Sequence, residues 1–345
     1  MSEHGTLTAA ASRKIQNMGI LCAFLIVIIH CRPHFERGTA GWWLAEILEN
    51  GVTQIAVPFF FAVSGYMVGR GLQRGGYRNA VRKRIYTLLV PFVLWNALFL
   101  LSKLFWENAS ALLHGEDLSF SFPTLQQIGL WPTDCPFLSP LWYVRALFVL
   151  VVLSPVFVWC LKKFRLWFLS LLFVVYAVVC PFWPLPDAGA WSYFARVGIF
   201  PVLGLFYFSL GLALQEGIVD AGKLAISPVV SLSVGIGFAV LRAVFVYQGV
   251  PAAQYLGFLC VHFTLYGLWG LMDDRRWPQW LVANSFGVYL LHKFVLTPIV
   301  LLLRPERSVA TYLAIAVFAF AVSLALSELL RRTMPKTSAV LFGGR

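Results

Sequence analysis

The sequence predicts an all-α membrane protein, built as a single bundle of about ten transmembrane helices. Hydrophobic residues make up 59% of the chain and charged residues only 12%, against about a quarter charged in an ordinary soluble domain. Apolar runs long enough to cross a bilayer core recur along the chain. Because no long polar stretch separates a second unit, we expect one membrane domain at residues 15–330, with cytoplasmic segments at 1–14 and 331–345.

Ten apolar or nearly apolar runs have the length of a membrane span, which is roughly 17 to 25 residues. The first run follows a polar N-terminal segment and has no convincing small-residue cleavage site, so we expect a retained span rather than a signal peptide. In chain order, the predicted spans are approximately 15–33, 52–69, 85–102, 141–161, 166–183, 196–214, 224–246, 253–272, 281–303 and 309–330.

Lys and Arg residues in the loops predict the orientation, because they are concentrated on the cytoplasmic side of membrane proteins. With a cytoplasmic N-terminus, 18 of the 27 Lys and Arg residues fall inside and six fall outside or at the outer edge. Three lie within spans: Arg145, Arg242 and Lys293. An even number of spans then places both termini in the cytoplasm. The net charge of +12 is explained by this topology, so we expect no nucleic-acid partner.

Two predicted outer segments are long enough to fold. Segment 34–51 mixes aromatic and acidic residues, a composition that favours a short helix at the membrane interface. Segment 103–140 is interrupted by prolines, so we expect a partly helical cap where a bulky acceptor has room to dock; the alternative is a plain connecting loop. The aromatic and acidic residues of the first segment include Trp42, Trp43, Glu46 and Glu49.

The cysteine and histidine patterns favour no metal site. His30 and His34 stand four apart, but Pro33 interrupts a helix between them and no third ligand is adjacent. Cys31 and Cys135 both lie on the predicted outer side, where a disulfide is conceivable, although two free thiols are the simpler interpretation.

His30 is the residue that most needs an explanation. It lies in the apolar stretch that begins at Ile15, about two thirds of the way across the membrane by helical rise. An ionisable group inside a transmembrane helix is costly, and it is a functional candidate for that reason.

Other polar residues fall at comparable depths and predict a positively charged cavity. Arg145, Arg242 and His262 are expected in the outer half with His30, and Asn96, His292 and Lys293 nearer the middle. Each has an alternative interpretation. The two arginines are long enough to snorkel to the interface, and His262 has the pattern of a packing histidine. His292 and Lys293 are adjacent, so only one of them can face a given cavity directly.

Five strings in order resemble the acyltransferase type 3 family of ten-span membrane acyltransferases. Members transfer acyl groups from cytoplasmic acyl-CoA to hydroxyls of cell-envelope carbohydrates or antibiotics, mostly at the outer side of the bacterial inner membrane. The strings are the first span from Ile15 to His30, PFFFAVSGY at 58–66, RKRIYTLLVPFVLWN at 82–96, PLWYVRAL at 140–147 and NSFGVYLLHKF at 284–294.

The chain departs from the family pattern at three positions. Many members begin the first span with an Asp and an Arg, where this chain has Gln16 and Gly19. Many also carry a Glu five residues after the Trp of the fourth-span motif, where this chain has Leu147. The resemblance is therefore to a divergent branch, in which the role of the missing arginine is either unfilled or supplied from another helix.

The resemblance implies an O-acyltransferase that moves an acyl group, with acetyl expected first, from acyl-CoA to a carbohydrate hydroxyl. His30 is the expected base or covalent acyl carrier, and Arg145 the cation that stabilises the oxyanion. At the mouth of the third span, basic side chains are expected to hold the CoA phosphates, with simple positive-inside anchoring as the alternative. Those donor-site residues are Arg82, Lys83 and Arg84, and the expected lining of the acyl channel is Ser64, Tyr66, Asn96, Trp142, Arg242, His292 and Lys293.

A transporter or a polysaccharide exporter is the alternative function, because ten spans with buried His, Arg and Lys can also form a transport path. Against it, the sequence has no acid placed as a proton carrier and no internal repeat. The sequence does not set the oligomeric state.

Overall fold

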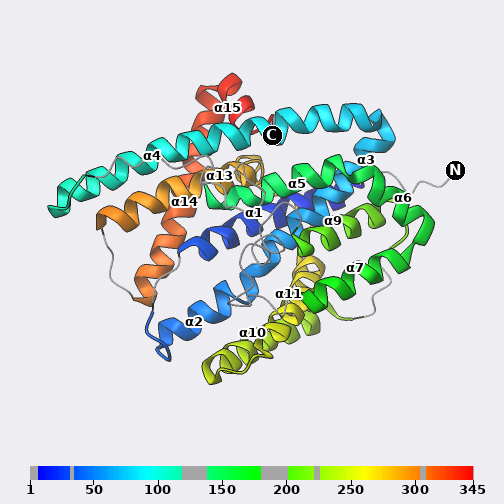
Figure 1. Cartoon of the computed structure of the whole chain (residues 1–345), viewed down its shortest axis with the longest axis horizontal. Helices are drawn as coiled ribbons and strands as arrows, with labels where there is room; N and C mark the ends of the chain where they lie inside the picture. Colours follow the sequence, from blue (N-terminus) through cyan, green and yellow to red (C-terminus); the bar gives the residue numbers. More distant parts are fainter. Residues whose placement is uncertain are drawn as a thin grey trace.

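The computed structural model describes residues 7–31, 35–118, 138–179, 201–220, 226–303 and 308–344, and every regular element in these ranges is a helix (Figure 1). In chain order the longer helices are α1 (Ala9–Cys31), α2 (Ala40–Glu49), α3 (Ala56–Arg84), α4 (Val90–His114), α5 (Trp142–Val152), α6 (Ser154–Phe164), α7 (Leu166–Val179), α9 (Val202–Gln215), α10 (Pro228–Gln248), α11 (Ala253–Leu271), α13 (Ser285–Pro298) and α14 (Val309–Thr333). The shorter ones are η1 (Val52–Ile55), η2 (Ile85–Leu89), η4 (Ser139–Leu141), α12 (Gln279–Val282), η6 (Ile299–Leu303) and α15 (Pro335–Leu341).

The all-α prediction is confirmed for the described residues, and each of the ten predicted spans overlaps at least one helix. Length and apolarity together qualify five helical stretches as membrane spans, or six if the pair α5 and α6, bent by 61°, counts as one. The apolar helices α7 and α9 have only 14 residues each. The count of ten spans and the cytoplasmic termini therefore stay predictions.

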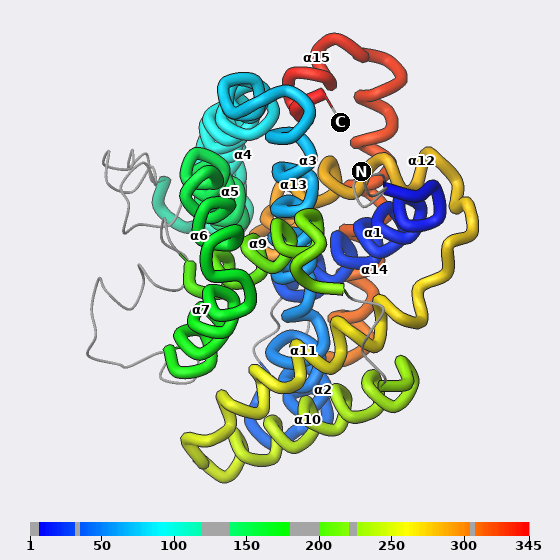
Figure 2. Tube along the Cα trace, turned by 90° about the vertical axis from the view of Figure 1, so that its right-hand side faces the viewer, coloured from blue at the N-terminus to red at the C-terminus, as the bar shows by residue number. Residues whose placement is uncertain are grey.

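Helix α1 lies against the middle of the bundle. Figure 2 shows α3 and α13 between α1 on one side and α4 and α5 on the other. The first half of α1 is tied to the chain that follows α11, because Asn17 donates to the backbone oxygens of Asp273 and Arg275 at 3.3 and 3.0 Å. Arg13 reinforces this tie through the carbonyl of Asp274. These bonds fix where the other end of α1, which carries His30, comes to lie.

Helix α3 runs past the predicted span and reverses at Gly76, which has a φ of 72°. A left-handed backbone of this kind favours glycine, which has no Cβ to clash. After the reversal, the chain continues through the π-helical turn η2 into α4 (Figure 1). Arg84, the last residue of α3, therefore lies just before α4 enters the bundle.

Helices α3 and α9 cross at backbone contact. A Cβ on Gly65 would lie 2.0 Å from the carbonyl oxygen of Phe208, and one on Gly211 would lie 1.9 Å from that of Ala62. Small residues at a helix crossing permit this close approach in membrane proteins. The crossing holds α3 in a fixed position, and with it Ser64, the neighbour of Gly65.

The predicted helix in segment 34–51 is confirmed as α2, which packs on α10 (Figure 1). Trp42 and Trp43 pack against Tyr247 with tilted rings, whose centroids are 5.8 and 5.1 Å from that of Tyr247. The contact also contains an ion pair between Glu46 and Arg242. Two further predictions lie outside the described residues: most of the cap in segment 103–140, from 119 to 137, and the Cys135 partner of Cys31.

The C-terminal segment 331–345 contains the end of α14 and the helix α15, which packs on α4. Trp95 of α4 donates a hydrogen bond from Nε1 to the carbonyl of Leu341 at 2.7 Å. The ring of Phe342 stacks on Trp95 with centroids 6.0 Å apart, and only 2% of Phe342 is exposed. The segment is thus part of the packed structure, and its cytoplasmic location stays a prediction.

Candidate active site

The structure brings together two histidines from opposite ends of the chain. His30 lies at the end of α1, and His292 lies in α13. Their ring centroids are 5.0 Å apart, with the ring planes at 57°. His30 is half-buried, whereas His292 is completely buried. Both were predicted site residues, and their contact makes this end of α1 the centre of the candidate active site.

Backbone hydrogen bonds set the tautomer of each ring. Nδ1 of His30 is 2.9 Å from the carbonyl oxygen of Ile26, and Nδ1 of His292 is 2.7 Å from that of Tyr289. A carbonyl oxygen only accepts, so in each neutral ring Nδ1 donates and Nε2 carries the lone pair. Nε2 of His30 is therefore the nitrogen that can take a proton from a hydroxyl or attack an acyl carbon.

Nε2 of His292 is buried and has no hydrogen-bond partner among the residues that the structure describes. An unpaired buried acceptor costs about 1–3 kcal/mol, so its persistence in a packed interior is a feature to explain. His292 lies on the same side of α13 as Tyr289, whose ring centroid is 6.4 Å away.

A carboxylate that the sequence did not place here joins this cluster. Glu49, the last residue of α2, lies within electrostatic reach of Cys31 and of Tyr312 on α14. Lys293, on α13, also interacts electrostatically with Cys31. The predominantly positive cavity stays a prediction, and the structure adds an acid to it, because α2 folds back and brings Glu49 to the end of α1. No local pattern could have revealed Glu49, since the contact depends on how two distant helices pack.

A line of polar and aromatic side chains leads from this cluster toward Arg84. The ring of Tyr289 is 6.1 Å from that of Tyr143 on α5, and the Tyr143 hydroxyl hydrogen-bonds with Oγ of Ser64 at 3.1 Å. Arg84 interacts electrostatically with Tyr143. The sequence motifs contained Tyr143 and Tyr289, but their role in joining the helices was not foreseen.

The three basic residues at the predicted donor site separate in space. Arg82 and Lys83 are exposed, whereas Arg84 is half-buried and within electrostatic reach of Tyr143. A guanidinium at the entrance to the bundle can pair with phosphate oxygens in the forked geometry that arginine favours. Of the three, only Arg84 is partly buried, and the other two have the exposure expected of anchors or outer phosphate contacts.

Several predicted lining residues have structural partners. Asn96 donates to the carbonyl of Phe92 and accepts from the backbone amide of Leu138, at 2.9 and 3.0 Å, so its amide joins α4 to the chain before η4. Arg242 is buried in its ion pair with Glu46, in the contact between α2 and α10. Their assignment to the acyl channel stays a prediction.

Arg145 and Trp142 lie on α5, one helical turn apart. Arg145 is half-buried, and the Trp142 ring is 6.2 Å from that of Phe61 on α3. Since α5 also carries Tyr143, the helix borders the line that leads to His292. The prediction that Arg145 is the cation beside His30 remains to be tested.

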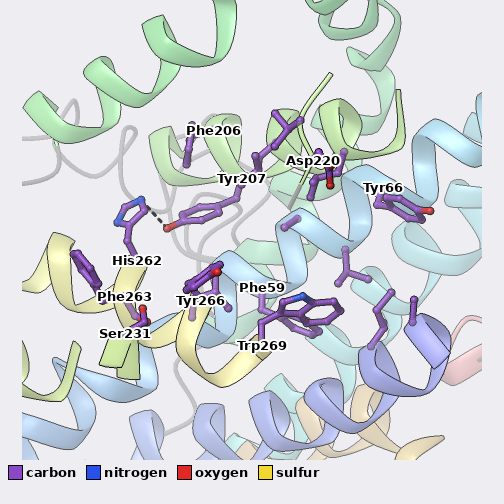
Figure 3. Close-up of a pocket in the computed structure, with 18 of the residues that line it drawn as sticks. Phe59, Tyr66, Phe206, Tyr207, Asp220, Ser231, His262, Phe263, Tyr266 and Trp269 are labelled. Atoms are coloured by element: carbon purple, nitrogen blue, oxygen red, sulfur yellow. Dashed lines mark hydrogen bonds between the residues drawn. The ribbon is translucent and has the colours of Figure 1, made fainter. Parts of the chain in front are cut away.

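A cavity of about 850 Å³ lies on another side of α3 (Figure 3). It is mostly apolar and lies between α1, α3, α9 and α11, with Tyr66 and Asp220 toward one end and His262 toward the other. Among its lining residues are Phe59, Val63, Tyr207, Ser231, Phe263 and Trp269. Ser64 and His30 do not line it, so Ser64 and Tyr66, predicted as one lining, face different spaces.

His262 has the surroundings of a packing histidine. Its Nδ1 donates to the carbonyl of Phe258 at 2.8 Å, and its Nε2 accepts from the Tyr207 hydroxyl at 3.1 Å. Both nitrogens of His262 are therefore hydrogen-bonded.

In the described ranges, no three His, Cys, Asp or Glu residues are grouped as metal ligands. The expectation of a metal-free reaction stays a prediction.

Comparisons with known proteins connect this geometry to a family. The chain is similar to the succinoglycan biosynthesis protein ExoH of Rhizobium meliloti (strain 1021), with 25% identity over 98% of this chain and 94% of that protein. It is also similar to the nodulation protein NolL of Sinorhizobium fredii, with 26% identity over 30% of this chain and 29% of that protein. No solved structure matches.

The sequence profile of the acyltransferase domain family matches residues 14–328. This range begins in α1 and ends in α14, so it includes both histidines and the line that leads to Arg84. The apolar helices agree with a chain that crosses the membrane several times. The chain therefore belongs to this acyltransferase family and is a multi-pass membrane acyltransferase.

Proposed function

We propose that this protein is an O-acyltransferase that moves an acyl group, acetyl first among the candidates, from acyl-CoA to a hydroxyl of a cell-envelope carbohydrate. The observation that carries the proposal is His30: a half-buried imidazole whose Nδ1 is held by Ile26, which leaves Nε2 basic at the end of a polar line from Arg84. The similarity to a protein named for succinoglycan biosynthesis supports a polysaccharide as the acceptor.

The reaction needs a base and a way to stabilise negative charge. The acceptor hydroxyl attacks the thioester carbonyl carbon, a C–O bond forms, and the hydroxyl proton passes to Nε2 of His30. When the C–S bond breaks, the CoA thiolate leaves and takes up a proton. Arg145 is the proposed cation for the oxyanion.

Arg84 is the proposed contact for the CoA phosphates on the cytoplasmic side. Support comes from its position at the end of α3, half-buried and within electrostatic reach of Tyr143. Arg82 and Lys83 are exposed beside it and would strengthen the attraction of the polyanionic donor. With the Lys and Arg asymmetry of the loops, this supports a proposed arrangement in which the donor binds on the inner side and the acceptor on the outer side of a bacterial inner membrane.

The experiment uses the full-length protein purified in detergent. Labelled acetyl-CoA and, separately, succinyl-CoA are incubated with neutral hexose oligosaccharides, and thiol release and acylated sugar are measured. We expect His30→Ala to lose transfer by about 10²-fold or more, the usual contribution of a general base. The matched control is His114→Ala, which changes an exposed histidine at the end of α4.

The same assay separates the enzyme from a transporter or exporter, because acyl transfer needs no sealed compartment. Full turnover in His30→Ala would refute the assignment of His30. If the wild-type protein neither binds nor consumes acyl-CoA with any acceptor, the acyl-CoA donor is refuted.

A further inference from the structure

We propose that His292 is a positioning residue that shares the proton taken up by His30, so that the two imidazoles act as a pair. This inference rests on the proposed function, since it concerns the proton removed from the acceptor hydroxyl. Its observation is distinct: a completely buried Nε2 atom of His292 with no hydrogen-bond partner in the described part of the chain, in a ring 5.0 Å from that of His30.

The tautomers make the two rings complementary. Because Nδ1 of His30 is already bonded to the carbonyl of Ile26, the proton that arrives on this ring must bind at Nε2. The resulting imidazolium has a new N–H group that needs an acceptor in a poorly solvated interior. His292 offers that acceptor, because its own Nδ1 donates to the carbonyl of Tyr289 and its Nε2 keeps a lone pair.

Burial indicates that His292 acts through His30 rather than on the substrate. With none of its surface exposed, the His292 ring has no access to an incoming sugar or thioester. His30 is half-buried and lies at the end of α1, where a substrate can approach. A proton, in contrast, passes between neighbouring rings without any opening of the structure.

Neighbouring charges favour sharing of the proton over its complete transfer. Lys293 follows His292 directly and opposes a full positive charge on that ring. Glu49 acts on Cys31 and Tyr312, on the His30 side, and favours positive charge there. The charged and titratable groups near the pair are thus Lys293, next to His292, and the group of Cys31, Glu49 and Tyr312 next to His30, with Arg145 as the proposed cation on α5. The balance that we propose keeps the proton on His30, with His292 as its hydrogen-bond acceptor.

The proton balance is complete without any further reactant. The acceptor hydroxyl loses its proton to Nε2 of His30 as the C–O bond forms, and the N–H group so formed is shared with Nε2 of His292. When the C–S bond breaks, the proton returns through His30 to the thiolate, and free CoA leaves as the thiol. Both imidazoles end the cycle neutral, with their Nδ1 protons unchanged.

Two substitutions separate this role from packing. His292→Asn places an amide near the position of Nδ1 and keeps the donor to the Tyr289 carbonyl, but it removes the Nε2 acceptor. His292→Gln reaches the position of Nε2 and can present its amide oxygen there. We expect His292→Asn to lower turnover by about tenfold or more while the Michaelis constant for acetyl-CoA changes less than twofold. His292→Gln should recover part of the loss.

The pH dependence is the readout that a packing role would not move. Loss of the acceptor weakens proton binding at His30, so the acidic limb of the pH–rate profile should shift to lower pH by about one unit, equivalent to tenfold in proton affinity. A loss of rate that is equal in Asn and Gln variants, with the profile unmoved, would show that His292 only packs and would overturn the proposal.

A measurement that needs no turnover keeps the two proposals distinguishable. In detergent-solubilised protein labelled with ¹⁵N-histidine, the His30 signals are assigned with His30→Gln and followed against pH. We expect the His30 transition to move to lower pH in His292→Asn and to stay near the wild-type position in His292→Gln. An unmoved transition in His292→Asn refutes the pair even if acyl transfer is observed. A moved transition supports the pair even if acetyl-CoA proves not to be the donor.

Discussion

Replacing Gly65 by alanine should separate α3 from α9 and disturb the candidate site. The added Cβ would lie 2.0 Å from the carbonyl oxygen of Phe208 and 2.9 Å from its carbonyl carbon. These are backbone atoms of a buried helix, so no side-chain rotation can relieve the overlap and the helices themselves must move. Because Ser64 precedes Gly65 and hydrogen-bonds with Tyr143, the displacement reaches the line that leads to His292.

Overpacking of a close-packed interior costs about 1–3 kcal/mol, and the rigidity of the backbone places Gly65→Ala toward the upper end. The matched control is Gly71→Ala in the same helix, where a Cβ meets nothing within 4 Å. In an open helical position, alanine is favoured over glycine by about 0.5–1 kcal/mol. The two substitutions, identical in chemistry, should therefore have opposite effects on stability.

The assay is thermal unfolding of the purified protein in detergent, followed by loss of the monodisperse peak in size-exclusion chromatography, together with acyl transfer. Gly65→Ala should melt below the wild type and lose activity, whereas Gly71→Ala should melt at or above it and remain active. If Gly65→Ala is as stable as Gly71→Ala, α3 and α9 do not cross at backbone contact and the reasoning fails.

Three further predictions follow from single contacts. Arg84→Ala should raise the Michaelis constant for acetyl-CoA about tenfold or more, because it removes a half-buried phosphate contact. Arg82→Ala, which changes an exposed residue, should raise this constant less than about threefold. Equal effects of the two substitutions would count against Arg84 as the phosphate contact. Tyr143→Phe removes a hydroxyl bonded to Ser64, and we expect a loss of about 0.5–1.5 kcal/mol in unfolding free energy, read from thermal unfolding. Arg242→Met removes the ion-pair partner of Glu46 and should destabilise the protein by about 3–5 kcal/mol. The double variant Arg242→Met with Glu46→Leu should recover much of that stability, and no recovery would argue against the ion pair.

The sequence predicted the helices better than their contacts. Apolar runs determine which segments become buried helices, and this property is local, so each predicted span overlaps a helix. The position of Glu49 near Cys31 depends on how α2 returns toward α1, and no short stretch of sequence contains that information. The partial burial of Arg84 depends on the reversal of the chain at Gly76 and on the π-helical turn η2 that follows Arg84. Hydrophobicity alone reveals neither of these two features.

Side-chain roles within the site were predictable only in part. His30 stood out as a candidate because an ionisable residue in an apolar helix is rare and costly. The structure places its ring beside that of His292, and the catalytic role of His30 stays a prediction. Depth along a span is readable from the sequence, but the direction of a side chain around the helix is not. Arg242 shows the difference, since it lies in a span as predicted and is paired with Glu46 in the contact between α2 and α10.

The two sides of α3 suggest how one bundle can serve two unlike substrates. Ser64 faces Tyr143 and the polar line between Arg84 and the histidines, whereas Val63 and Tyr66 face the apolar cavity that ends near His262. A polar acyl donor and its thiolate product are stabilised by hydrogen-bond donors and by cations, and the first side has Arg84 together with the hydroxyls of Ser64 and Tyr143. We therefore expect the chemistry of acyl transfer on the Ser64 side, whereas the lining of the cavity on the other side is mainly apolar.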